Sequence, residues 1–560
     1  MIEPVSQISL ADESTFDKSL LPLVIGVVGH RDPIPTNIQR LRESFKSDLR
    51  KLLKEIPHTP LLMITGLSSG MDIEAAEAFL QIVAEEQKTN SRCLPHQLIA
   101  AMPKNKENYA NDFLLKEERE RFEHLLSQCS HYYDPSNSSF LRGEAPKGTE
   151  LSPPDCYGQQ SLFLAKYCYM IFAFYDGKET SRIGGTSHTV ATHKGELHSN
   201  FLTMDEIISI QEPSALIEYH TPRKNNIFNN KEQRNDSKFW LGNQIKDQLI
   251  DLLETPYKIN IINKAIASPS SFHFSTHGLP TALWCYADAK AKELKGSLQL
   301  AQLSLVVVGW GITISLAEPP WQAIGLLMIF TSLGLFPRID NQAKQGFIEH
   351  RCLAEALMIQ DFWVKLGVEV ESPGLFQSQL HLSLGWIRTV LRARYLQLKR
   401  HSIVNPVLLE EIVSSGKNWI DDQCIWLERR IRKQNNSDKL LIYSERTILF
   451  IALCSSAFAT NPIYKEALMW FTEICIASFL AIFAFRQLLG YDETKARYKR
   501  SLHTFKRASI IINNVINSSI GSPEKLKQIK FVFEALGREK FDELNDWIAN
   551  QLKRSYNPAG

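Results

Sequence analysis

The stretch Leu23–Pro33, which reads LVIGVVGHRDP, is the key to the fold of the N-terminal part of this chain. An apolar run ends there in a polar turn, which is the pattern of a strand buried inside a parallel sheet. Similar apolar runs recur up to residue 225 and alternate with helix-like stretches, as in a parallel sheet covered by helices. We therefore predict an α/β, Rossmann-like domain. Its strands are expected at Leu23–Val28, Leu61–Thr65, Gln97–Ala101, Met170–Tyr175 and Leu216–Tyr219, and its helices at Thr36–Glu55, Asp72–Glu86, Asp112–Ser127 and Gln159–Tyr167.

The loops that follow these strands hold the candidate ligand-binding residues. Ligands of such sheets bind outside the carboxyl ends of the strands, where loops meet the N-termini of helices. Glycines there allow close backbone approach, and hydroxyl, imidazole and guanidinium groups can donate to a phosphate or ribose. No GxxxxGK[ST] pattern follows a strand, so a P-loop ATPase is not expected. The candidates are Gly29, His30, Arg31, Gly66, Ser68, Ser69, Gly70, Asp72, Asp176, Gly184, Gly185, Thr186 and Arg223.

Composition argues against several other classes of protein. The chain has 560 residues, which is more than a single hydrophobic core usually organises, so more than one domain is expected. A net charge of +2 supplies no general field for nucleic acid, and we expect no nucleic-acid partner. The nine cysteines are scattered without a CxxC pair, so neither a disulfide framework nor a metal site is predicted. The N-terminus is acidic and lacks the apolar core of a cleaved signal peptide, so the first domain is expected in the cytoplasm.

Two pairs of apolar segments predict transmembrane hairpins. The first pair is Leu303–Leu316 and Trp321–Phe336, joined by a turn that contains two prolines. The second pair is Thr447–Ala459 and Leu468–Phe485. Its first arm is short and its second contains Glu473, an ionisable residue of the kind that faces a partner or a water-filled path inside a membrane. A buried hairpin of a soluble protein is the alternative for either pair.

Basic residues flank both pairs, whereas the two turns contain only Lys465. The positive-inside bias then places the N-terminal, middle and C-terminal polar parts in the cytoplasm. We expect a multi-pass protein of the inner (plasma) membrane.

These patterns divide the chain into six parts. They are a nucleotide-binding α/β domain at 20–225, a polar linker at 226–278 with one amphipathic helix over Trp240–Leu253, a helix and the first hairpin at 279–340, a cytoplasmic helical region at 341–440, the second hairpin at 441–490, and C-terminal cytoplasmic helices at 491–560.

Motifs in the first of these parts resemble the SLOG superfamily of Rossmann-like domains, especially its prokaryotic branch related to the N-terminal domains of TRPM channels. The motifs are GVVGHRDP at 26–33, TGLSSGMDIEAAEA at 65–78, IAAMP at 99–103, FYDGK at 174–178, GGTS at 184–187 and TPR at 221–223. The resemblance implies a pocket for a nucleotide-derived ligand of the ADP-ribose or cyclic-nucleotide type. LOG-like hydrolases of this superfamily carry PGGxGTxxE, whereas here Ile183 replaces the proline and no glutamate follows at the matching spacing. Binding without turnover is therefore expected, with no catalytic residue and no cofactor.

The helical remainder, including RCLAEALMIQDFWVKLG at 351–367, resembles SLATT-type membrane effectors. Together the two resemblances imply a ligand-gated, homo-oligomeric effector of bacterial antiphage defence (abortive infection) that opens a pore or disrupts the bilayer. The alternative is a membrane-tethered hydrolase of NAD or a nucleotide, with Asp176, His30 or Asp72 as acid or base. A constitutive channel or scaffold is a third option.

Overall fold

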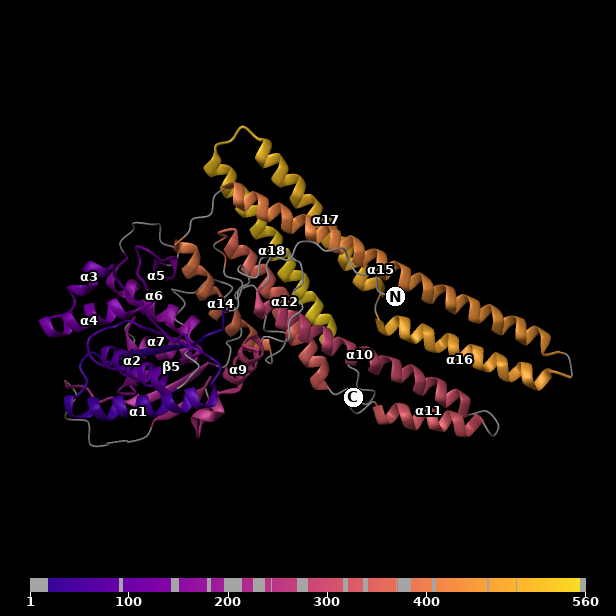
Figure 1. Ribbon diagram of the computed structural model, residues 1–560, viewed down its shortest axis with the longest axis horizontal. Coiled ribbons are helices and arrows are strands. Elements are labelled where there is room, and N and C mark those ends of the chain that lie inside the picture. Colours follow the sequence, from indigo (N-terminus) through magenta and orange to yellow (C-terminus); the bar gives the residue numbers. More distant parts are fainter. Residues whose placement is uncertain are drawn as a thin grey trace. The chain divides into compact units, whose positions relative to one another are not determined.

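The computed structural model of the chain describes residues 19–89, 94–142, 151–178, 183–195, 214–224, 237–242, 244–268, 281–315, 321–335, 341–368, 370, 384–404, 409–460, 463–489 and 491–553. They form two compact units (Figure 1). An α/β unit contains the described residues up to 268 together with 384–404, and a helical unit contains those of 281–370 and from 409 onward. An N-terminal α/β sheet followed by a mostly helical region is therefore confirmed.

An eight-stranded sheet of order β4-β3-β2-β1-β5-β6-β7-β8 forms the centre of the α/β unit. The central strand β1 (Leu23–Gly29) pairs in parallel with β2 (Leu61–Thr65) on one side and with β5 (Met170–Tyr175) on the other. The chain order reverses between β1 and β5, the position at which sheets of this kind bind ligands. The parallel part also contains β3 (Gln97–Ala101), β4 (His131–Tyr133) and β6 (Ala215–His220), and β7 (Lys238–Leu241) and β8 (Gln244–Lys246) are antiparallel.

Helix α1 (Pro35–Glu55) illustrates how the helices cover the sheet. A proline opens it, and Leu41, Phe45, Leu49 and Leu52 are buried along one face. The Phe45 ring meets the rings of Phe172 and Phe174 in β5 edge-on, with centroids 5.0 and 5.8 Å apart. The other helices of this unit are α2 (Met71–Thr89), α3 (Lys106–Ala110), α4 (Lys116–Gln128), α5 (Ser139–Arg142), α6 (Pro153–Tyr167), α7 (Thr186–Lys194), α9 (Glu254–Ile266) and α14 (Gly385–Val404).

The predicted amphipathic helix over Trp240–Leu253 is wrong. The described residues of this stretch form the end of β7, a turn at Gly242 with φ 58°, β8 and a 3₁₀ turn at Leu249–Leu252. Short apolar runs fit a strand as well as a helix, and here the pairing of β7 with β6 selects the strand. A cation–π contact further stabilises this strand, because Lys194 Nζ lies 3.7 Å from the centre of the Trp240 ring.

Asn263 in α9 shows that the segment after β8 belongs to the sheet unit. Its Oδ1 accepts from the Leu21 N–H at 2.9 Å, and its Nδ2 donates to Leu21 O at 2.9 Å and Thr59 Oγ1 at 3.2 Å. Asn263 is fully buried. Helix α14 belongs here as well, since Gln397 Nε2 donates to Leu20 O at 2.7 Å and Tyr395 packs on Phe140. The predicted helical region at 341–440 is thus shared between the two units.

The helical unit packs around Trp363 of α12 (Asn341–Lys365). The Trp363 Nε1–H donates to Phe533 O at 2.9 Å, and a Cβ on Gly537 would lie 2.3 Å from the indole. Both contacts fix α12 against α18 (Ser522–Lys553). The other helices are α10 (Ala282–Ser315), α11 (Trp321–Leu335), α15 (Leu409–Phe458), α16 (Lys465–Leu489) and α17 (Tyr491–Asn517).

Two helices in the described part of the chain are long and apolar enough to cross a membrane, namely α15 and the Lys465–Phe483 part of α16. They lie side by side (Figure 1), and only 17% and 11% of their apolar windows are buried, unlike the core helices of a soluble protein. In the first predicted hairpin the apolar part of α11, Gln322–Ser332, is shorter than a span. The 15 residues of α11 extend about 22 Å, against a hydrocarbon core of about 30 Å.

Replacing Asn263 by Leu should lower the free energy of unfolding of the α/β unit by about 3 kcal/mol, because buried backbone groups of Leu21 lose their partner. Hydrogen exchange of peptides that cover β1 measures this loss as faster exchange. Lys264→Leu, at the exposed neighbouring position, is the matched control and should leave the exchange unchanged. Slow exchange in both variants would show that α9 does not support the sheet.

Candidate functional site

The predicted ligand-binding residues follow the carboxyl ends of four parallel strands. Gly29 ends β1 and is followed by His30 and Arg31, and Gly66–Asp72 follow β2. Asp176 follows β5, Gly184–Thr186 lie at the start of α7, and Arg223 follows β6. Because these strands are parallel, all four loops emerge at the same edge of the sheet.

The loops after β1 and β2 are locked together at Gly70. This residue has φ +88°, and a Cβ there would lie 2.4 Å from His30 O and 2.7 Å from Arg31 O. The Met71 N–H, at the start of α2, donates to His30 O at 3.2 Å. Gly29 makes the matching close approach, since its Cβ would lie 2.5 Å from Met71 Cβ. These glycines are therefore required by loop packing, before any ligand is considered.

His30 joins the loop after β1 to the loop after β5. Its Nε2 accepts the Asp176 N–H at 3.0 Å and lies 3.2 Å from Asp176 Oδ1. Burial lowers the pKa of His30, an effect that the charge of Asp176 opposes. The neutral imidazole is favoured, and its Nε2 is already used as an acceptor. His30 therefore positions the two loops.

Asp72 is a buried carboxylate beneath the second loop, in the first turn of α2. Its Oδ2 accepts from the Ser68 hydroxyl at 2.9 Å and from the Ser68 N–H at 3.3 Å. Burial raises the pKa of Asp72 to about 6, and the hydrogen bonds from Ser68 and the charge of Arg31 oppose this shift. Ser69 follows Ser68 and begins the turn that ends at Gly70.

Arg31 is held at the rim by residues that the sequence did not predict. Its Nη2 donates to Tyr157 Oη at 3.1 Å, and the Tyr157 hydroxyl donates to Asp112 Oδ2 at 3.0 Å. Lys104 Nζ, after β3, donates to both carboxylate oxygens of Asp112 at 2.8 Å. The one available signal was Ser152 before two prolines, which starts α6 six residues earlier than predicted and so includes Tyr157 in the helix.

The glycine turn before α7 completes the site. Gly184, with φ +82°, packs against Tyr157, whose Cβ would lie 2.3 Å from an added Cβ. Gly185, with φ +90°, faces open space and is the N-cap of α7 without a side-chain cap. Gly185 is exposed, so the start of α7 borders solvent, a position that suits an anion.

Two predicted residues serve the packing of loops instead. Arg223 Nε donates to Asp32 Oδ1 at 2.8 Å and ties the end of β6 to the loop after β1. A Cβ on Gly66 would lie 2.5 Å from Gln160 Nε2, and that amide donates to Ala101 O at 2.6 Å.

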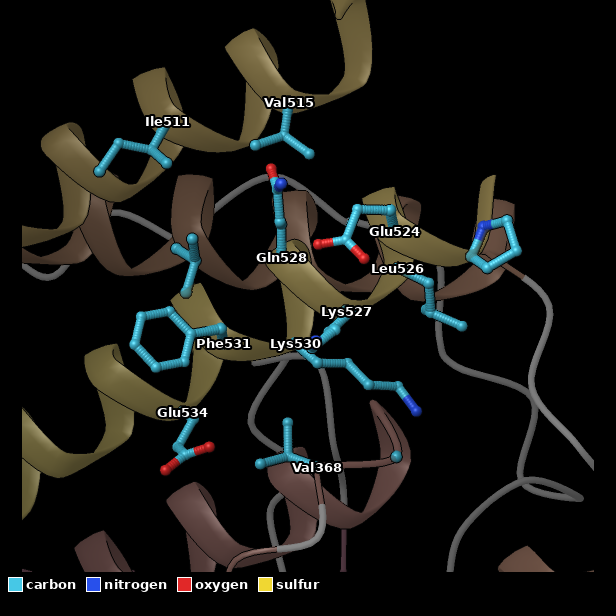
Figure 2. Close-up of a pocket in the computed structure, with 13 residues that line it drawn as sticks. Val368, Ile511, Val515, Glu524, Leu526, Lys527, Gln528, Lys530, Phe531 and Glu534 are labelled. Atoms are coloured by element: carbon cyan, nitrogen blue, oxygen red, sulfur yellow. The ribbon is translucent and has the colours of Figure 1, made fainter. Parts of the chain in front are cut away.

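The helical unit contains a pocket of about 710 Å³ beside α17 and α18. Figure 2 shows Ile511 and Val515 of α17 above α18, and Val368 below it. Two lysines and two glutamates line the pocket, so its charge gives no preference for an anion. Among the described residues, no cluster of His, Cys, Asp or Glu could hold a metal ion.

Comparisons of the sequence with models of known protein families and with curated proteins give no match. The function of the protein is therefore inferred from the geometry at the sheet edge.

Replacing Asp72 by Asn should stabilise the protein at pH 7 by about 3 kcal/mol. The native pKa of about 6 lies above the ordinary value of 3.8, so the native state binds the proton more tightly than the unfolded chain. Wild-type stability should consequently fall as the pH rises from about 4 to about 6, and the advantage of the variant should vanish at about pH 4. Urea unfolding across this range measures both, with the exposed Asp247→Asn as control. A constant difference at all pH values would contradict the prediction.

Gly70→Ala and Gly185→Ala form a matched pair at positive φ. Both should lose about 1 kcal/mol to backbone strain, but only the methyl group added at residue 70 meets backbone atoms, so Gly70→Ala should lose about 3 kcal/mol or more. Urea unfolding at one pH compares them. Equal losses would show that the two loops separate easily.

Proposed function

We propose that this protein is a membrane-associated sensor whose α/β unit binds a nucleotide-derived anion at the carboxyl edge of the sheet. The observation that carries the proposal is the exposed start of α7, where Gly185 has φ +90° and faces open space. Arg31 stands at the same rim, because Arg31 and Gly184 both contact Tyr157. A helix N-terminus and a guanidinium are both groups that bind phosphate in proteins.

A nucleotide suits this edge better than a simple anion. The Tyr157 ring is partly exposed, and the cations of Arg31 and Lys104 lie 5.6 and 6.0 Å from its centre. An aromatic face beside phosphate-binding groups can stack a base. The resemblance to SLOG domains supports the same ligand class, of the ADP-ribose or cyclic-nucleotide type.

The helical unit supplies the membrane part of the proposal. The α15–α16 pair carries exposed apolar side chains along its length, and burial in lipid would remove them from water. We propose that oligomers of these helices change membrane permeability when the ligand binds. The placement of both termini in the cytoplasm rests on the positive-inside bias, and a role in antiphage defence rests on the resemblance to SLOG and SLATT proteins alone.

Arg31→Gln should weaken binding of the anionic ligand by about tenfold or more, because a charge-assisted hydrogen bond contributes about 1.5–3 kcal/mol. Mass spectrometry of small molecules released from the purified protein identifies the ligand, and calorimetry then compares the variants. The control variant is Arg50→Gln, which removes the same charge from an exposed ion pair between Arg50 of α1 and Glu85 of α2. It should bind the ligand as tightly as wild type does. Equal affinity of all three proteins for the ligand would show that Arg31 does not bind it.

The hydrolase alternative is favoured by one observation, the pKa of about 6 that burial gives to Asp72. Incubation of the same samples with NAD and with the identified ligand separates the two functions. If wild type forms product and Asp72→Asn does not, the protein is an enzyme and the sensor proposal is wrong. Release of dye from vesicles that contain the protein, on addition of ligand, tests the membrane step.

A further inference from the structure

A buried charge cluster marks the level at which the α15–α16 hairpin changes from apolar to polar. Arg486, just after the apolar part of α16, places its Nε 2.7 Å from Asp438 Oδ1 and its Nη1 3.7 Å from Glu445 Oε2. Both carboxylates are buried, at 5% and 7% exposure. The end of the apolar run in α16 therefore lies beside residues 438–445 of α15.

A different face of α15 carries exposed basic and apolar side chains at this level. Lys439, Tyr443 and Arg446 follow one another at helical spacing and are exposed, and Leu440 adjoins them. Leu440 is 70% and Tyr443 65% exposed, although both are largely apolar. Neither Lys439 nor Arg446 forms an ion pair within the described chain, whereas Arg486 forms two. We call these four residues, Lys439, Leu440, Tyr443 and Arg446, the interfacial stripe.

The interfacial stripe continues into the apolar part of the helix. The next residues on this face are Phe450 and Leu453, which are 66% and 63% exposed. Along one helix face the order is therefore cation, aromatic ring, cation and bare apolar surface. Side chains at the boundary between lipid headgroups and hydrocarbon follow this order, because long cations reach outward while their stems stay in the apolar layer.

We infer that the interfacial stripe binds the headgroups of anionic phospholipids. The inference rests on the proposed membrane insertion of α15 and α16, and it adds a lipid-binding site with a defined charge preference. Among the described residues 438–446 of α15, the two acidic side chains, Asp438 and Glu445, are buried and paired with Arg486, whereas the two cations Lys439 and Arg446 are exposed. Continuity with exposed apolar surface favours a lipid over an acidic soluble protein, which would not cover Phe450 and Leu453.

The length of α15 supplies a matched control. Lys439 and Arg446 are seven residues apart, so they span about 10 Å, a distance comparable to the headgroup layer. Arg429 and Arg432 are also exposed on α15 but lie about 10–15 Å beyond Lys439. Charges at that distance from the membrane surface are screened, because the Debye length is about 8 Å in physiological salt.

The test uses the full-length protein reconstituted in phosphatidylcholine vesicles that contain some phosphatidylglycerol. Spin-labelled lipids of each type report the relative association constant of the two headgroups for the protein. Wild type should prefer phosphatidylglycerol. In the double variant Lys439→Gln/Arg446→Gln, the ratio of the two association constants should fall about fivefold for each cation removed. In the double variant Arg429→Gln/Arg432→Gln, this ratio should stay as in wild type. Added salt should weaken the preference of wild type.

Each outcome has a separate meaning. If the variant of the interfacial stripe retains the preference, or the distal variant loses it equally, the inference is overturned while the membrane insertion stands. Extraction by alkaline carbonate, applied to the same vesicles, tests the insertion itself. If wild type is extracted, the membrane part of the proposed function fails and the lipid site fails with it. Ligand binding to the α/β unit is measured independently of both.

Discussion

The burial of β1 between β2 and β5 is the feature that makes the candidate site possible. Leu23–Val28 are buried throughout, and pairing on both sides fixes the register of this strand. A slip by one residue would turn every side chain of the strand to the other face of the sheet. The carboxyl ends of the three strands therefore meet at one edge. Their loops then approach so closely that only glycine fits at residues 29 and 70.

The edge of the sheet combines a buried carboxyl group that opposes folding with two cations at the rim. Asp72 is buried beneath the loop, where its ionised form is unfavourable at neutral pH. Above it, Arg31 and Lys104 are held by Tyr157 and Asp112 at the rim. Strain and perturbed carboxylates concentrate at functional sites because stability alone would not retain them. The edge is therefore the part of the α/β unit where we expect a ligand.

The helical unit follows a different rule, in which charge is sorted around one helix. Helix α15 extends without a break over 50 residues, from a polar N-terminal part into an apolar end. Its acidic side chains Asp438 and Glu445 turn toward Arg486, and its cations at the same level face outward. Sorting of this kind pairs the acidic side chains with Arg486 at the contact between α15 and α16, while Lys439 and Arg446 stay exposed.

The amino-acid sequence was enough to locate the central strands, because strands buried on both faces must be almost continuously apolar, as Leu61–Thr65 and Met170–Tyr175 are. It also located the glycine turns and the apolar segments of the second hairpin. It could not locate β4 or β7, since runs of three or four residues carry no distinct period. The folded chain was needed to bring Lys104, Asp112 and Tyr157 to Arg31, because each is an ordinary polar residue until the parallel strands place their loops side by side. Local pattern reports burial, whereas a binding site depends on contacts between residues far apart in the chain.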